Sequence, residues 1–255
     1  MGSRVQTILG HDLGGSIVRR HLVIAPTLER HQLYPACKRI FDIVVSALVL
    51  VIASPFMLLI ALLIMCDSRG PAVYTQERVR LVRRRNGSSK SSEVGTFTMY
   101  KYRTMVQGAS SATHRAFVEA YIRNDEETMA SLQGSDTKVR KLVNDPRITR
   151  IGKLLRRTSL DELPQLWNVL RGDMSLVGPR PPIPYEVEMY EPWHFQRLSS
   201  TPGLTGLWQV RARSSATFDE MVKLDMDYLE HCCLWLDIKI LFQTPLVALG
   251  GKGSV

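Results

Sequence analysis

Two adjacent carboxylates, Asp161 and Glu162, stand among basic residues in the stretch RITRIGKLLRRTSLDELPQLWNVLRGDMSLVGPRPP, residues 147–182. The basic residues before the pair are Arg150, Lys153, Arg156 and Arg157, and a stiff turn after it, residues 178–181, presents Arg180. Arginine binds phosphate oxygens in bidentate pairs, and a nucleotide diphosphate offers oxygens for several arginines. A carboxylate near such groups stays ionised and can act as a nucleophile, while its neighbour can hold a divalent cation. This pattern indicates chemistry on a phosphorylated substrate.

The same pair also fits a purely structural role. Ser159, followed three residues later by Glu162, matches a capping box, and Asp161 would favour the positive end of a helix. Pro164 is tolerated near a helix start, so a new helix running to Leu170 is expected. Because capping boxes are common, the basic residues around the pair, rather than the pair itself, favour a catalytic site.

One apolar run, from Ile40 to Met65, stands apart from the rest of the chain. A helix of this length would reach roughly 39 Å, enough to cross a bilayer core of ~30 Å. A cleavable signal peptide is not expected, because the run begins far from the N-terminus and lacks a small-residue cleavage site. A buried core helix is disfavoured by the length.

Pro55 near the middle of this run predicts a bend, because it removes a backbone donor and clashes with the carbonyl of Val51. Ser54 can donate a hydrogen bond to a freed carbonyl, which makes a bend tolerable in lipid. Both flanks are basic, whereas a spanning helix should show an asymmetry of Lys and Arg. The flanking residues are Lys38, Arg39, Arg69, Arg78, Arg80, Arg83, Arg84 and Arg85. A re-entrant hairpin bent at Ser54-Pro55 is favoured, and a kinked span remains the alternative.

The bulk composition allows several anionic partners. The 255 residues carry 33 Lys and Arg against 24 acids, a net charge of +9. Such a surplus suits nucleic acid, an anionic phospholipid membrane or a diphosphate. A nucleic-acid interface would need exposed aromatics among the basic residues or a recognition helix, and neither is found, so no nucleic acid is expected. The four cysteines form neither a disulfide framework nor a zinc spacing and are predicted to be reduced thiols.

Hydrophobic spacing predicts a mixture of short strands and helices around the carboxylate pair. The expected strands are residues 72–79 and 96–105, joined by a loop with an Asn-Gly tip over residues 82–94. The expected helices are residues 109–132 and 217–232. Residues 233–249 are interpreted either as an amphipathic segment lying in a membrane interface or as a core-packed terminal helix.

Other candidate motifs favour structural roles. Asp225-Met226-Asp227 is a D-x-D pattern, but residues two apart on a helix point to different faces. The six histidines are scattered without a metal-ligand spacing. Trp208 and Trp235 are expected in the core or at an interface.

Several motifs in series resemble the monotopic polyprenyl-phosphate phosphoglycosyl transferases, also called bacterial sugar transferases. The matching pieces are KRIFDIV at residues 38–44, Ser54-Pro55, YKYRTM at 100–105, the stretch NDPRITRIGKLLRRTSLDELPQLWNVLRGDMSLVGPRP at 144–181 and TPGLTGLWQV at 201–210. Together they extend across roughly residues 38–245 in the expected order. A series of this kind is far more specific than any one motif.

The resemblance implies that Asp161 attacks the β-phosphorus of a UDP-sugar, that UMP leaves, and that polyprenyl phosphate then takes the sugar phosphate. It implies Glu162 as a catalytic partner and Mg²⁺ ligand. The implied substrate-binding residues are Arg156 for phosphate, Arg180 in the nucleotide pocket, and Lys101 and Arg103 in the same cleft. Lys38 and Arg39 would meet lipid head groups. The product would begin the assembly of an exopolysaccharide, O-antigen or capsule glycan.

The implied fold is mixed α/β and helix-rich. Residues 1–36 form a poorly ordered arm, and residues 37–68 form a re-entrant membrane helix-break-helix bent at Ser54-Pro55. Residues 69–255 form a small cytoplasmic catalytic domain with interfacial amphipathic helices, the last of them C-terminal. The implied location is the cytoplasmic face of the bacterial inner membrane, and a homo-oligomer is left open.

The chain departs from the family pattern at three places. Arg211-Ala212-Arg213 replaces a Gly-containing turn, and the connection 80–94 and the segment 107–144 are longer than in minimal members. These departures leave the sugar and the acceptor-side loops unpredicted. A non-catalytic membrane anchor that recruits assembly partners is the alternative function, and it would not need Asp161-Glu162 among arginines.

Overall fold

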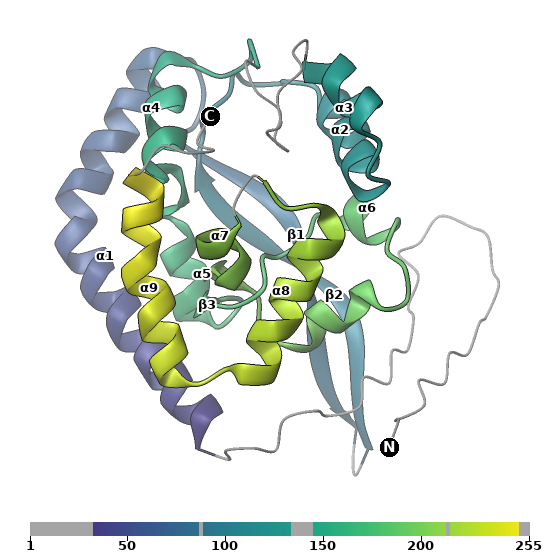
Figure 1. The fold of residues 1–255 in the computed structure, drawn as a ribbon. Helices are drawn as coiled ribbons and strands as arrows, with labels where there is room; N and C mark the ends of the chain where they lie inside the picture. Colours follow the sequence, from purple (N-terminus) through teal and green to yellow (C-terminus); the bar gives the residue numbers. More distant parts are fainter. Residues whose placement is uncertain (1–32, 87–88, 134–144, 213–214, 250–255) are drawn as a thin grey trace.

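The computed structural model describes residues 33–86, 89–133, 145–212 and 215–249 (Figure 1). Its helices are α1 (Tyr34–Asp67), α2 (Ala112–Ile122), α3 (Glu126–Gln133), α4 (Arg150–Thr158), α5 (Gln165–Arg171), α6 (Pro184–Val187), α7 (Leu207–Arg211), α8 (Phe218–His231) and α9 (Leu234–Leu249). Two short 3-10 segments are η1 (Leu160–Glu162) and η2 (His194–Ser199), and the strands are β1 (Val73–Asn86), β2 (Ser89–Tyr102), β3 (Ser175–Val177) and β4 (Gly203–Thr205). The helix-rich mixed α/β prediction is confirmed. The arm predicted for residues 1–36 lies almost wholly outside the described residues.

A long antiparallel hairpin, β1–β2, runs through the domain (Figure 1). Its register pairs Val73 with Tyr102 at one end and Asn86 with Ser89 at the other. The loop predicted for residues 82–94 is therefore wrong, because most of it is strand. Cross-strand pairing satisfies the main chain there in spite of the polar, Ser-rich composition. The Asn-Gly tip itself lies at the boundary of the described residues.

A second, very short sheet pairs β3 with β4 in parallel. The two segments approach so closely that a Cβ atom on Gly203 would lie 2.1 Å from the main-chain nitrogen of Gly178. A side chain at Gly203 would therefore push the two segments apart. This contact holds the turn that carries Arg180 beside β4.

The main hydrophobic core lies between the hairpin and helices α5, α8 and α9. Val169 and Val177 are fully buried in it. The helix predicted for residues 217–232 is confirmed as α8, where Thr217 and Glu220 form a capping box. The helical spacing of residues 109–132 corresponds to α2 and α3 with a break between them.

Helix α1 continues without interruption through Pro55. The break that the sequence predicts at Ser54-Pro55 is therefore absent. The hydroxyl of Ser54 donates to the carbonyl of Val51 at 2.8 Å, the carbonyl that Pro55 leaves without its amide donor. This confirms the compensation predicted for Ser54. In Figure 1, α1 arches along one side of the domain with both ends turned toward it.

Both ends of α1 are bound to the rest of the domain. Near its start, Asp42 accepts a hydrogen bond from the amide of Leu176 at 3.1 Å. Near its end, the carbonyl of Met57 accepts one from the hydroxyl of Tyr102 at 2.8 Å, and Asp67 accepts one from the amide of Ile151 at 3.1 Å.

The opposite face of α1 is apolar and exposed. Only 11% of its most apolar 18-residue window is buried, and by length and composition the helix could cross a membrane. The exposed side chains include Val44, Leu48, Val51, Ile52, Leu58 and Leu59. A core helix of a soluble protein would bury these residues, so α1 presents an apolar surface that its own domain leaves uncovered.

Helix α9 combines the two interpretations of the C-terminal segment. Asp237 and Ile240 are buried against the core, while Trp235, Phe242 and Leu246 are exposed. The helix therefore packs on the domain by one face and presents apolar side chains on another. Trp208, by contrast, is buried in a core cluster, as predicted.

Candidate active site

The carboxylate pair lies on η1, directly after α4. Thr149 caps the start of α4, with its hydroxyl accepting from the amide of Gly152 at 3.0 Å. Ser159 ends the helix in the left-handed conformation, with φ of 59°. The predicted capping box is wrong, because Ser159 terminates α4 and its side chain makes no capping bond to the following turn. The tight turn directs Asp161 and Glu162 toward the hairpin, and α5 begins at Gln165.

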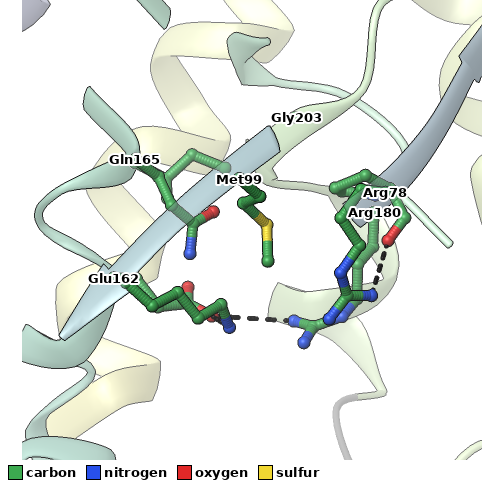
Figure 2. Close-up of a pocket in the computed structure, with 9 residues that line it drawn as sticks. Arg78, Met99, Glu162, Gln165, Arg180 and Gly203 are labelled. Atoms are coloured by element: carbon green, nitrogen blue, oxygen red, sulfur yellow. Dashed lines mark hydrogen bonds and ion pairs between the residues drawn. The ribbon is translucent and has the colours of Figure 1, made fainter. Parts of the chain in front are cut away.

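Two of the predicted cations converge on Glu162. The ammonium of Lys101, from β2, lies 3.1 Å from Glu162 Oε1, and the Arg180 guanidinium lies 3.7 Å from the same oxygen. Figure 2 shows Glu162 and Arg180 meeting across the pocket, joined by a dashed line. Lys101 lies 61 positions before Glu162 in the chain, and Arg180 lies 18 positions after it. The fold brings these three residues together, which is consistent with a common binding site.

Asp161 lies in the electrostatic field of the whole cluster. Burial, and after it the negative charge of Glu162, raises the pKa of Asp161 to about 6. Positive charge acts in the opposite direction, from Lys101, Arg156 and Arg180. Asp161 is therefore largely ionised at neutral pH while still partly desolvated, which suits a nucleophile.

Arg156 approaches from α4. Its Nε donates to the hydroxyl of Thr104 at 2.9 Å, and burial lowers the pKa of its guanidinium. The structure thus brings four of the predicted residues, Lys101, Arg156, Arg180 and Glu162, around Asp161.

A small pocket opens beside Glu162. Besides Lys101 and Arg180, it is lined by two polar residues that the sequence did not single out as site residues, Arg78 and Gln165. Arg78 is only 5% exposed, and burial, followed by the charge of Arg180, lowers its pKa to about 10. In the sequence Arg78 is one member of a basic flank, and nothing local separates it from its neighbours.

Three other predicted residues make contacts within the protein. Arg103 is buried, and its guanidinium donates to the carbonyls of Arg69, of Ser68 at 2.8 Å and of Gly70 at 3.1 Å, beyond the end of α1. Arg103 is absent from the lining of the pocket beside Glu162. Lys38 forms an ion pair of 2.8 Å with Asp237, and Arg39 donates to the carbonyls that end α5.

The D-x-D pattern divides between two environments, as predicted. Asp225 is buried and pairs with Arg197 at 2.7 Å, whereas Asp227 is exposed and pairs with Arg211 at 3.1 Å. Among the described residues, no group of three or more His, Cys, Asp or Glu could hold a metal ion. All four cysteines are free in the structure.

Residues 33–251 match the family model of the bacterial sugar transferases. The chain therefore belongs to the bacterial sugar transferase family. It is 42% identical over 217 residues to the undecaprenyl-phosphate galactose phosphotransferase of Salmonella typhimurium, an overlap of 85% of this chain and 41% of that protein. It is 37% identical over 218 residues to the exopolysaccharide production protein ExoY of Rhizobium meliloti, covering 85% of this chain and 87% of ExoY.

A third relative is the UDP-glucose:undecaprenyl-phosphate glucose-1-phosphate transferase of Caulobacter vibrioides, 37% identical over 81% of this chain and 67% of that protein. The chain spans about two fifths of the length of the Salmonella relative. The segment shared with all three contains Asp161, Glu162 and the cations around them.

Proposed function

We propose that this chain is a phosphoglycosyl transferase that moves a sugar phosphate from a UDP-sugar to polyprenyl phosphate. The observation that carries the proposal is a partly buried carboxylate pair, Asp161-Glu162, with Lys101, Arg156 and Arg180 around it. The names of the relatives support this reaction, because they are undecaprenyl-phosphate sugar phosphotransferases or exopolysaccharide production proteins.

The reaction proceeds in two displacements at phosphorus. First, a carboxylate oxygen of Asp161 bonds to the β-phosphorus of the UDP-sugar, and the bond from that phosphorus to the bridging oxygen breaks, so UMP leaves. Next, an oxygen of polyprenyl phosphate bonds to the phosphorus of the aspartyl sugar phosphate. The Asp161 carboxylate is released, and the lipid carries a diphosphate sugar. Nucleotide and lipid therefore need not occupy the site together.

The residues around Asp161 supply charge where phosphoryl transfer needs it. Lys101 and Arg180 would face the oxygens of the diphosphate, and Arg156 adds a third positive charge near the nucleophile. Catalysis of this reaction type comes mainly from such positioning and electrostatic stabilisation.

Mg²⁺ fits this donor set. The ion is commonly held in proteins by one or two carboxylates together with substrate phosphates and water, and Glu162 supplies such a carboxylate. The repulsion between Glu162 and Asp161, which contributes to the raised pKa of Asp161, would be relieved by a bound divalent cation. When bound, the ion would neutralise charge on the phosphoryl oxygens.

We further propose that α1 is re-entrant and that both of its ends lie on the cytoplasmic face of the bacterial inner membrane. The support is that residues near both ends, Asp42 and Asp67, bind the same domain. A straight span would carry one end across the bilayer. The apolar outer faces of α1 and α9 would then lie in the membrane among anionic phospholipids, with Asp161 near the level where the phosphate of the lipid substrate emerges.

The test of the reaction is the identity of the released nucleotide. Membranes carrying the protein, with a UDP-sugar, Mg²⁺ and polyprenyl phosphate, should release UMP, and a panel of UDP-sugars should reveal the sugar. Without the lipid, mass spectrometry should find one sugar phosphate on the peptide containing Asp161. Release of UDP would indicate ordinary glycosyl transfer, and no release with any sugar would favour the non-catalytic anchor.

The topology can be tested with the protein's own cysteines. Cys37 and Cys66 lie near the two ends of α1 and are exposed. In variants that keep one cysteine each, a membrane-impermeant maleimide should label both in inside-out vesicles and neither in intact spheroplasts. Labelling of either cysteine from the periplasmic side would show instead that α1 crosses the membrane.

A further inference from the structure

The pocket beside Glu162 contains hydrogen-bond donors that the protein itself does not satisfy. Within the described residues, Gln165 Nε2 and Arg78 Nε are buried and have no hydrogen-bond partner. Their side chains are only 3% and 5% exposed in all. Buried polar groups are nearly always paired, so two unpaired donors lining one pocket point to acceptor atoms of a ligand.

The pocket is short of acceptors. Three of its side chains are cationic, and of the side chains that line it only Glu162 is negatively charged. Lys101 and Arg180 both turn toward the same Glu162 oxygen, at 3.1 and 3.7 Å. In Figure 2, Gln165 and Glu162 face Arg78 and Arg180 from opposite sides of the pocket, with the Met99 side chain between them.

The Arg78 side chain and the helix that carries Gln165 are held in place by other contacts. Gln165 begins α5, and Asn168 one turn later is fully buried and binds β2 through the amide of Tyr100 at 3.0 Å and the carbonyl of Thr98 at 2.7 Å. Arg78 donates through its terminal nitrogens to the carbonyl of Pro181 at 2.9 Å and to Gln76 at 2.8 Å. The Arg78 guanidinium and the backbone of Gln165 are therefore in position before a ligand arrives, which lowers the entropy cost of binding.

We propose that Gln165 and Arg78, together with Lys101 and Arg180, form a subsite for the phosphoryl oxygens of the donor diphosphate. In the structure described here, the Glu162 carboxylate lies where such an oxygen would bind, between Lys101 and Arg180. A bound diphosphate takes over these two cations, and Glu162 becomes available to a divalent cation. The inference rests on the proposed function.

The chemistry of the subsite favours phosphate over a sugar hydroxyl or a base. A hydroxyl both donates and accepts, and a uracil ring presents an N–H as well as carbonyls, so each would need acceptors in the pocket. Phosphoryl oxygens only accept, and their negative charge matches the surplus of cations.

The first test is Gln165→Leu, with inorganic pyrophosphate as the probe and Mg²⁺ absent. Calorimetry should find pyrophosphate binding weaker by about ten- to a hundredfold, the loss of one hydrogen bond to a charged group. The KM for the UDP-sugar should rise, while uridine binding and the KM for polyprenyl phosphate stay unchanged. Gln196→Leu, at an exposed position in η2, is the matched control and should bind pyrophosphate as the parent does.

Folding should not obscure this result. Because the Gln165 amide nitrogen has no partner, replacement by leucine removes an unsatisfied donor and is expected to leave the melting temperature unchanged or higher. Pyrophosphate binding within about twofold of the parent would overturn the inference. So would an equal loss for uridine and pyrophosphate.

The second test asks whether a substitution at Glu162 makes pyrophosphate bind more tightly or more weakly. Glu162→Gln removes the carboxylate that competes for Lys101 and Arg180, so it should bind pyrophosphate several-fold more tightly without Mg²⁺. Weaker pyrophosphate binding would refute the inference that the diphosphate replaces Glu162 as the partner of Lys101 and Arg180. The binding tests need no turnover: release of UDP would refute the proposed function alone, whereas UMP release with an unchanged donor KM in Gln165→Leu would refute the subsite alone.

Discussion

Two clusters of charge, one buried and one partly buried, lie in the same domain and differ in how completely their groups are paired. In the first, the Arg197 guanidinium contacts Asp225 at 2.7 Å, Glu186 at 3.3 Å and the hydroxyl of Tyr190 at 2.8 Å. In the second, around Asp161 and Glu162, cations are in excess and two donors have no partner. The first arrangement is what a structural network requires, and the second leaves bonding capacity for a ligand.

The pKa values do not separate the two clusters. Burial raises the pKa of Asp225 to about 6 against the opposing charge of Arg197, and burial with the charge of Glu162 raises that of Asp161 to about 6 as well. A perturbed carboxylate is therefore an insufficient sign of catalysis, because buried ion pairs perturb pKa values too. What separates the two clusters is that the one around Asp161 and Glu162 combines unpaired donors with an excess of cations in a single pocket.

The two clusters are also connected. Arg197 donates to the main-chain carbonyl of Arg180 at 3.3 Å, so the fully paired cluster supports the segment that carries a cation of the other. The difference between them can be tested by making the same Asp→Asn substitution in each.

Asp161→Asn should have the largest effect on activity. The amide cannot act as the nucleophile, so UMP release should fall by about 10³-fold or more, with loss of the sugar phosphate adduct. The global fold should remain, because Asp161 is not part of the core. Asp225→Asn, assayed at a temperature where it stays folded, should lose less than about tenfold. An active Asp161→Asn enzyme would exclude the covalent mechanism.

Asp225→Asn should have the larger effect on stability. Removing one partner of a buried ion pair leaves Arg197 incompletely compensated, and the free energy of unfolding should fall by about 3–5 kcal/mol. Chemical denaturation in detergent would measure the change. Asp227→Asn is the matched control, since its exposed pair with Arg211 should contribute no more than about 1 kcal/mol. Equal stability of the two variants would contradict a structural role for Asp225.

The pH dependence of the first displacement should identify the carboxylate whose ionisation controls the release of UMP. The nucleophile must be ionised, so the burst of UMP measured without lipid should decline, approaching tenfold per pH unit, once the pH falls below the pKa of Asp161, which is about 6 without a metal ion and lower with Mg²⁺ bound. Glu162→Gln removes a charge that raises the pKa of Asp161, and should move this limb to lower pH. Asp225→Asn should leave the limb in place. The opposite pattern would assign the titration to the structural cluster.

Local patterns predicted the elements that depend on local signals. The spacing of apolar residues was sufficient to place α8 within one residue at each end. The Asp161-Glu162 pair and its cations were found because their residue types reveal chemistry directly. Ser54 was correctly matched to the carbonyl that Pro55 leaves without its donor.

The remaining features depend on contacts between distant segments. The polar residues 82–94 resemble a loop, and only pairing across the hairpin makes them strand. Arg103 and Arg78 look alike in sequence, yet one is bound to carbonyls beyond the end of α1 and the other lines the pocket. Gln165 was missed because an unpaired amide can be recognised only after the positions of its neighbours are known.

The attachment of α1 to α9 has a consequence for synthesis. Lys38 finds its partner Asp237 only 199 residues later along the chain. At ~5–20 residues per second, a ribosome needs roughly 10–40 s to cover that interval. During this time α1 lacks α9, which completes its packing, and the described part of the chain leaves the apolar face of α1 uncovered. Delivery of the nascent chain to lipid should therefore precede completion of the catalytic domain.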